Sequence, residues 1–401
     1  MPRIVHRHDV ELDRLVAVDL GRDLDRILID SRIAQSPDRV DVSTTFDFAH
    51  AHSWLAQAAA DAGKHSGPAP SVFFELPRDS KMASYMSGQD PKMFEGIVHR
   101  LSALFDGALS HLTVNEKVRN ELSRSLDQIN TARFSAAACG GVPGEGGGAS
   151  KFDILASYGP WYVCVYDQQP LSSITGVFDA TSKVFNDPAF RNVFNSKSVS
   201  FAKHPAPAGL PTGSVAYELA LDSEAFAKAV MKLVGDGAGK SANKDQKKPD
   251  KAAPSKLTIY VVPDGPRTLL GMGTQVSELQ SHLQTLKKAA PEARLGSTVD
   301  LAWLRQTPTV AGGYFTIASL TKAFEKGVAA SEARLGHKEP QKPIADALST
   351  APHHGQTPIV IAWSIKGDRA APKVEATVRL DRAVFEDAFS VGTQYALQFA
   401  R

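Results

Sequence analysis

The chain has 401 residues, of which 43% are hydrophobic and 22% charged, and its formal net charge is only +2. This balance excludes the low-hydrophobicity, high-charge composition of disordered chains, and the length suits two or three domains. No apolar run approaches the roughly 18 to 20 residues that span a bilayer, so no transmembrane segment is expected.

The N-terminal segment, residues 1–132, predicts a mixed α+β unit. Alternating apolar residues from 40 to 46 indicate a strand, and residues 71–76 indicate another. Residues 91–132 carry two apolar stripes at helical spacing, with Thr113 and Glu116 framing a capping box between them, so an inserted αα-hairpin is expected. The first strand lacks the preceding strand found in later units, which suggests that this segment is incomplete.

Two modules follow, residues 133–235 and residues 257–401, and both are built from repeated ββα units. In the first module, strands are predicted at residues 134–139, 152–157 and 161–166. Each pair of short alternating strands precedes an amphipathic helix. The predicted fold class is therefore α+β, with antiparallel sheets and helices on one face.

The segment between the modules, residues 236–256, predicts a flexible linker. It holds six lysines but no aromatic residue. Nucleic-acid binding usually needs a concentrated basic face with interleaved aromatics, so no nucleic-acid partner is expected, whereas a protein partner is.

Three segments, residues 40–58, 215–233 and 374–389, share one pattern when aligned on Asp47, Asp222 and Asp381. Apolar residues alternate before each aspartate and follow helical spacing after it. An aspartate at such a switch can accept a hydrogen bond from an amide of the first helical turn. We therefore interpret all three as helix N-caps.

The sharpest chemical pattern lies at residues 318–322, Ala-Ser-Leu-Thr-Lys. It resembles the active-site segment of penicillin-recognising serine peptidases, in which a serine opens a helix and a lysine one turn later helps deprotonate it. That resemblance would make Ser319 the nucleophile and Lys322 its base. The family's Ser or Tyr-x-Asn and Lys-Thr-Gly elements are absent, so Ser319 as a helix cap is the favoured interpretation and no catalytic residue is assigned.

Neither a cofactor nor a metal is expected. Residues 235–241 resemble a phosphate-binding loop but are one residue short and lead into the linker rather than a helix. His50 and His52 are two residues apart, which on a helix directs them to different sides and disfavours a shared metal ion.

The two cysteines, Cys139 and Cys164, lie in strand-like stretches and leave two alternatives open. If residues 152–157 form a strand between theirs, the cysteines are too far apart to bond; if their strands pair directly, a disulfide is within range. We favour two reduced, buried thiols, because sequence neighbours usually pair in a meander.

The paired strands, capped helices and low-complexity linker together resemble bacterial exported proteins and lipoproteins of unknown function. The resemblance implies a noncatalytic binding or scaffold protein of the bacterial envelope; the alternative is a serine hydrolase using Ser319 and Lys322. Residues 1–8 are basic but lack the apolar stretch of a signal peptide. The expected location is therefore periplasmic or lipid-anchored if a leader is missing, and cytoplasmic otherwise.

Overall fold

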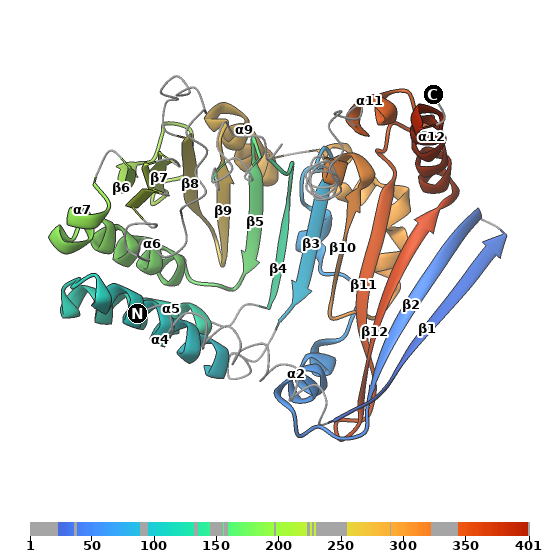
Figure 1. Cartoon of the computed structure of the whole chain (residues 1–401), viewed down its shortest axis with the longest axis horizontal. Helices are drawn as coiled ribbons and strands as arrows, with labels where there is room; N and C mark the ends of the chain where they lie inside the picture. The colour runs from blue at the N-terminus through green and yellow to red at the C-terminus, as the bar shows by residue number, and fades with distance from the viewer. Residues whose placement is uncertain are drawn as a thin grey trace.

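A 12-stranded antiparallel sheet organises the described part of the chain (Figure 1). This computed structural model describes residues 23–35, 38–88, 95–131, 135–144, 155, 159–195, 198–222, 225–226, 228–229, 255–288, 290–321 and 344–399. The strand order is β1-β2-β12-β11-β10-β3-β4-β5-β9-β8-β7-β6, and every neighbouring pair is antiparallel. The predicted α+β class is confirmed.

The strands are β1 (Leu24–Gln35), β2 (Asp38–Phe48), β3 (Met82–Ser87), β4 (Ala136–Gly141), β5 (Tyr162–Asp167), β6 (Val199–Pro205), β7 (Val215–Leu221), β8 (Ser255–Asp264), β9 (Arg267–Gly273), β10 (Ala311–Thr316), β11 (Pro358–Gly367) and β12 (Pro372–Asp381). The helices are α2 (Trp54–Ala62), α3 (Ser71–Phe74), α4 (Glu95–His111), α5 (Glu116–Thr131), α6 (Leu171–Asn186), α7 (Pro188–Val193), α9 (Val276–Lys288), α11 (Ile344–Ser349) and α12 (Arg382–Phe399), with 3-10 turns η1 (Gly63–His65), η5 (Pro291–Ala293), η6 (Leu295–Ser297) and η7 (Val299–Arg305).

Segments far apart in the sequence share this sheet. Strands β1 and β2 extend the C-terminal hairpin β11–β12, and β3 lies between β10 and β4. The division into residues 1–132, 133–235 and 257–401 stays a prediction, and all three segments contribute strands to the one sheet.

Most predicted elements are present. The helices of the αα-hairpin are α4 and α5, although Asn115, not Thr113, caps α5 by accepting the Lys117 N–H at 2.9 Å. Residues 71–74 form the short helix α3 rather than a strand; a short buried apolar run fits either structure. The predicted strand at residues 152–157 lies outside the described residues apart from Leu155, which is in a 3-10 turn.

The first unit does have a preceding strand, so the expectation that it lacks one was wrong. Strand β1 forms a hairpin with β2, and its alternating Ile27, Ile29 and Ile33 were the available signal. The charged residues between them hid the alternation.

Helices cover both faces of the sheet at its β4–β8 end, rather than one. One core lies between the sheet and α9, and it contains Val163, Val165 and Leu269. A second core lies between the opposite face of the sheet and helices α6 and α7, and it contains the neighbouring residues Cys164 and Leu270. Successive strand residues face opposite ways, so both rows are apolar because both are buried. We call these the α9 side and the α6 side of the sheet.

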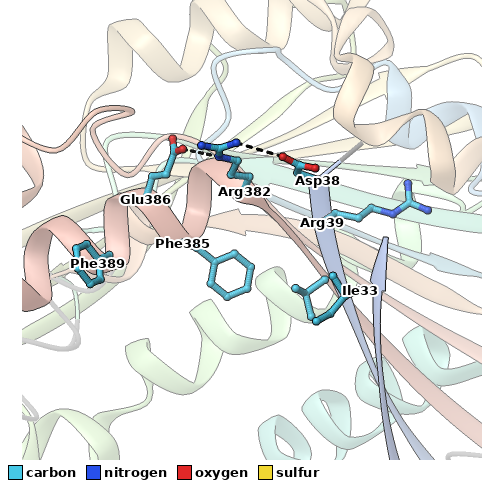
Figure 2. A pocket seen from close by; sticks show the side chains of 8 residues that line it. Ile33, Asp38, Arg39, Arg382, Phe385, Glu386 and Phe389 are labelled. Atoms are coloured by element: carbon cyan, nitrogen blue, oxygen red, sulfur yellow. Dashed lines mark hydrogen bonds and ion pairs between the residues drawn. The ribbon is translucent and has the colours of Figure 1, made fainter. Parts of the chain in front are cut away.

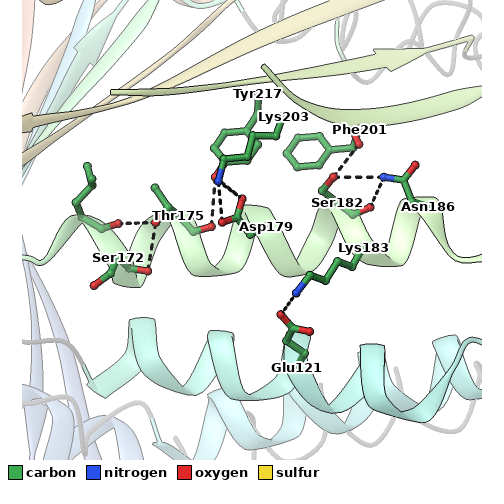
Figure 3. A network of polar contacts seen from close by, with 11 residues as sticks. Glu121, Ser172, Thr175, Asp179, Ser182, Lys183, Asn186, Phe201, Lys203 and Tyr217 are labelled. Carbon is green, nitrogen blue, oxygen red and sulfur yellow. Dashed lines mark hydrogen bonds and ion pairs between the residues drawn. The ribbon is translucent and has the colours of Figure 1, made fainter. Parts of the chain in front are cut away.

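Helix α6 is fixed to the sheet by polar contacts as well as by packing (Figure 3). Asp179 accepts hydrogen bonds from the Tyr217 hydroxyl at 2.8 Å and from the Lys203 Nζ at 2.8 Å. Burial, with Asp179 close by, raises the pKa of Tyr217 and keeps its phenol neutral. On its other side, α6 pairs Lys183 with Glu121 of α5, so α5 forms an outer layer.

The cysteines correct a prediction. Strands β4 and β5 pair directly, with Cys139 opposite Cys164, and the two are joined in a disulfide. The preference for reduced thiols was wrong because it assumed an intervening strand.

The three aspartates differ in role, although their local sequences match. Asp222 is a cap: its Oδ1 accepts the Ala225 N–H at 2.9 Å. Asp47 is not, because Ser53 caps α2 while Asp47 remains in β2 and binds Arg26 and Lys373. Asp381 ends β12 directly before α12, and burial, with Asp300 close by, raises the pKa of its carboxyl.

Candidate functional site

The β11–β12–β2–β1 end of the sheet has one polar and one apolar face. On the α9 side, Arg379 binds Asp41 through Nε and Nη2 at 2.9 and 3.1 Å, and its guanidinium lies 4.0 Å from the centre of the Trp303 ring. Ser43 and Thr377 hydrogen bond at 3.0 Å. On β2 and β12, these polar side chains of the face therefore bind one another within the protein.

The opposite face of these strands is apolar. Its rows follow from the strand register: Ile361, Val378 and Val42 lie abreast, as do Trp363, Ala376, Thr44 and Ile29. We call it the open apolar face, made of Ile27, Ile29, Ile33, Val40, Val42, Phe46, Val374, Val378, Leu380, Ile361 and Trp363. Ile29 is 75% exposed and Ile33 is 77% exposed, values unusual for large apolar side chains on a sheet.

Two elements limit the open apolar face along the strands. At one end, η1 approaches β11 so closely that a Cβ on Gly63 would lie 3.1 Å from the Ile365 Cγ2. At the other end, Phe385 and Phe389 of α12 line a pocket of about 500 Å³ with Ile33 and Val40 (Figure 2). The result is a shallow apolar trough between α2 and α12.

The α12 end of the trough has a charged rim. Arg382 binds Asp38 at 3.2 Å and Glu386 at 2.7 Å, as Figure 2 shows. Hydrogen bonds from His353 and Arg382 lower the pKa of Glu386. All three charges therefore have partners, which leaves the aromatic rings below them as the available surface.

Helix α12 is held in place by a buried carboxylate. Asp387 accepts the backbone N–H groups of His353 at 2.8 Å and Gly355 at 2.7 Å. This anchor, made to the loop after α11, fixes the helix face that carries Phe385 and Phe389.

A second pocket, of about 420 Å³, continues the trough across β11 onto β10 and β3. It is lined by Met82, Ala83, Ser84, Tyr85, Met86, Ala137, Cys139, Ala311, Gly312, Gly313, Tyr314, Phe315, Ile361 and Trp363. We call it the β10 pocket. The lining has no Asp, Glu, Lys, Arg or His. The rings of Tyr85 and Tyr314 belong to the core on the α9 side, where burial raises the pKa of Tyr85 to about 12 and also raises that of Tyr314.

The floor of the β10 pocket is bare because β10 carries Gly313 there, opposite Ser84 of β3. A Cβ on Gly313 would collide with the Ala83 carbonyl oxygen of β3. Glycine is therefore required for β3 and β10 to pair this closely, and the pocket is a product of that pairing.

The sequence-predicted residue Ser319 lies at the start of a helix, outside the trough's lining. Its hydroxyl donates to the Thr316 carbonyl at 2.6 Å, and the Thr316 Oγ1 accepts the Ser319 N–H at 3.2 Å. Thr316 also donates its N–H to the Ser319 Oγ at 3.2 Å, a reciprocal arrangement typical of a capping box. Thr316 therefore occupies the N-cap position and Ser319 the third helical position, so the interpretation of Ser319 itself as the N-cap was wrong. Lys322 lies outside the described residues.

His50 and His52 precede α2 rather than lie on a helix, and their rings approach to 5.4 Å between centroids, so the expectation that they face different sides was wrong. The described residues hold no group of three or more metal-ligating side chains. The loop at residues 235–241 lies outside the described residues. In the described part of the chain, no helix is long and apolar enough to cross a bilayer.

Sequence reasoning missed the open apolar face and the β10 pocket. Each strand's alternation could be read, but which rows remain uncovered depends on the strand order. Comparison with protein families, curated proteins and solved structures finds no match for this chain.

Proposed function

We propose that this is a noncatalytic binding protein that holds a long acyl chain in the trough formed by the β10 pocket and the open apolar face. The observation that carries the proposal is the chemistry of the β10 pocket, whose lining on the α6 side includes two methionines and the rings of Phe315 and Trp363 but no charged side chain. A pocket of about 420 Å³ falls in the range of small-molecule sites. Methionine side chains adapt to flexible apolar ligands.

The extent of the trough favours an elongated occupant. From β3 to β1 the sheet makes five steps, and at about 4.8 Å a step this is roughly 24 Å. On the α6 side, a row of mainly apolar residues runs over this distance, from Met86 and Ala311 through Trp363 to Ile29, with Thr44 its one polar member. A compact ligand would fill the β10 pocket alone, whereas a long acyl chain can occupy the β10 pocket and extend over the open apolar face.

The burial of a chain here has an adequate driving force. Each methylene removed from water contributes about 0.8 kcal/mol, so a chain of a dozen or more methylenes offsets the cost of immobilisation. The exposed Trp363 and Ile29 lose contact with water at the same time.

The setting we propose is the bacterial envelope. A disulfide between the chain's two cysteines supports an oxidising compartment, because such bonds are rare where thiols are kept reduced. The periplasm is such a compartment, and it is one in which acyl chains need carriers or anchors.

The experiment is a fluorescence titration with cis-parinaric acid, a fatty acid that becomes fluorescent in an apolar site. We expect saturable binding with one chain per protein. The variant Ala311→Phe places a ring opposite Trp363 in the β10 pocket and should weaken binding at least ten-fold.

The matched control is Ala202→Phe, the same substitution on β6 at the far edge of the sheet, which should bind as the unaltered protein does. Linear, unsaturable fluorescence, or equal affinities for the two variants, would contradict the proposal. Far-ultraviolet circular dichroism of both variants establishes that they fold alike.

A further inference from the structure

We propose that the edge strand β1 pairs with β1 of a second copy of this chain, antiparallel and about a two-fold axis at Ser31. This interface is independent of the acyl-chain proposal. Strand β1 ends the sheet, and it runs for 12 residues along the right-hand side of Figure 1. A long edge strand presents a row of backbone N–H and C=O groups to any strand that can match it.

The side chains of β1 exclude most ways of pairing it with itself. In a continued sheet the two-fold axis is perpendicular to the sheet, so each face meets the same face of the copy. Directly opposite residues must then point the same way, which places the axis on a residue rather than between two.

Three of the central choices set like charges against each other. An axis at Ile29 places Arg26 opposite Arg32; an axis at Asp30 places that aspartate opposite its own copy; an axis at Arg32 does the same for arginine. Like charges directly opposite are destabilising.

A fourth choice, with the axis at Leu28, needs Arg26 as the partner of Asp30. Arg26 is already bound to Asp47 at 2.8 Å, and the strand is irregular between Leu24 and Arg26. This register would break an existing ion pair and run into the irregularity.

The axis at Ser31 is free of these conflicts and is complementary on both faces. On the α9 side it sets Asp30 opposite the copy's Arg32, and Arg32 opposite the copy's Asp30. On the α6 side it sets Ile29 and Ile33 opposite each other, again twice. These are the two most exposed isoleucines of the described residues, at 75% and 77%.

Neither Asp30 nor Arg32 forms an ion pair within the described part of the chain. The neighbouring Asp41 of β2, which lies opposite Arg32, is held by Arg379 instead. Reciprocal pairing in a dimer would therefore give both charges partners without disturbing contacts already made.

The interface has a consequence for the open apolar face. Because the two-fold axis places the α6 sides of both copies on the same side of the joined sheet, their open apolar faces would form one continuous apolar surface. The Ile29–Ile33 pairs would lie at its centre. Pairing would thus cover the exposed edge of each trough.

The test is sedimentation equilibrium on the full chain over a wide concentration range. We expect the apparent mass to rise from 43.0 kDa toward twice that value. The single variants Asp30→Arg and Arg32→Asp each set like charges opposite in the dimer and should raise its dissociation constant at least ten-fold. The double variant Asp30→Arg/Arg32→Asp restores both pairs and should dimerise as the unaltered protein does.

Mixing the two single variants gives the sharpest result. One chain then carries arginine at both positions and the other aspartate at both, so every pair across the axis is complementary. The mixture should form a heterodimer although neither variant self-associates well. As a control, Glu218→Lys reverses a charge on β7, away from this edge, and should not change the dissociation constant.

A protein that stays at 43.0 kDa at every concentration would overturn the proposal. So would a dimer that both single reversals leave unchanged, since that dimer would use another surface. Because the double variant and the mixture must regain what the single variants lose, misfolding cannot imitate the expected pattern.

Discussion

Cys139 and Cys164 face each other directly across the β4–β5 pair and are joined by a disulfide. The bond closes a loop between residues 25 positions apart, for which chain entropy gives a stabilisation of about 3 kcal/mol. We expect the double variant Cys139→Ala/Cys164→Ala to lose this much of the free energy of unfolding, and therefore to unfold at a lower denaturant concentration. An unchanged midpoint, or two free thiols in the unfolded, unreduced protein, would contradict the bond.

Asp222 caps the helical turn after β7 through the Ala225 N–H. Replacing it with alanine should lower the free energy of unfolding by about 0.5–2 kcal/mol, whereas Asp222→Asn should lose only a few tenths because asparagine caps nearly as well. Chemical denaturation of the two variants measures the difference. Equal losses would show that the negative charge, rather than the cap, is what matters.

Asp47 links stability to pH. Hydrogen bonds from Lys373 and Arg26 lower the pKa of its carboxyl below the ordinary 3.8. A lowered folded-state pKa means that the stabilisation is fully present above the ordinary value and is lost as the pH falls through the folded-state value. Asp47→Asn should therefore destabilise the protein near neutral pH and much less in acid.

Urea midpoints measured at about pH 7 and about pH 2, well below the ordinary pKa of an aspartate, check this linkage. The variant Lys373→Met removes a main partner of Asp47 and should reproduce much of the same pH dependence. If Asp47→Asn destabilised the protein equally at both pH values, the carboxylate's ionisation would not be the cause.

Ser319 is expected not to react as a nucleophile, since its hydroxyl donates to the Thr316 carbonyl. Incubation with a fluorophosphonate or a β-lactam should give no adduct on the peptide that contains Ser319. Thr316→Ala, by contrast, should cost about 1 kcal/mol of stability through the lost cap. A covalent adduct on Ser319, detected by mass spectrometry, would contradict this prediction and support the serine hydrolase alternative.

Local patterns predicted individual strands and helices well, because side-chain alternation follows directly from which face is buried. The strand at residues 215–221 begins and ends as expected. Pairing between distant strands was not predictable, since it depends on matching surfaces that no single segment contains. Asp47 illustrates this: its local sequence matches that of Asp222, but Lys373 comes from a strand 326 residues away.

The candidate site was unpredictable for the same reason. The apolar residues of β2, β11 and β12 could be assigned to strand faces, but a strand's apolar row is normally covered. Only the strand order shows that neither α6 nor α9 covers this row at the β1 end. The charged residues of β1 also obscured the alternation of its isoleucines, so the sequence did not indicate that β1 adds to this apolar face.

The pairing of β12 with β2 has a consequence for synthesis of the chain. The Arg379–Asp41 contact joins residues 338 positions apart, so the β1–β2 hairpin cannot join the sheet until nearly the whole chain has left the ribosome. At about 5–20 residues per second this delay is on the order of 15–70 s. For that time the hairpin has an exposed apolar row and lacks its β12 partner, so a chaperone that covers this row would protect the nascent chain from aggregation.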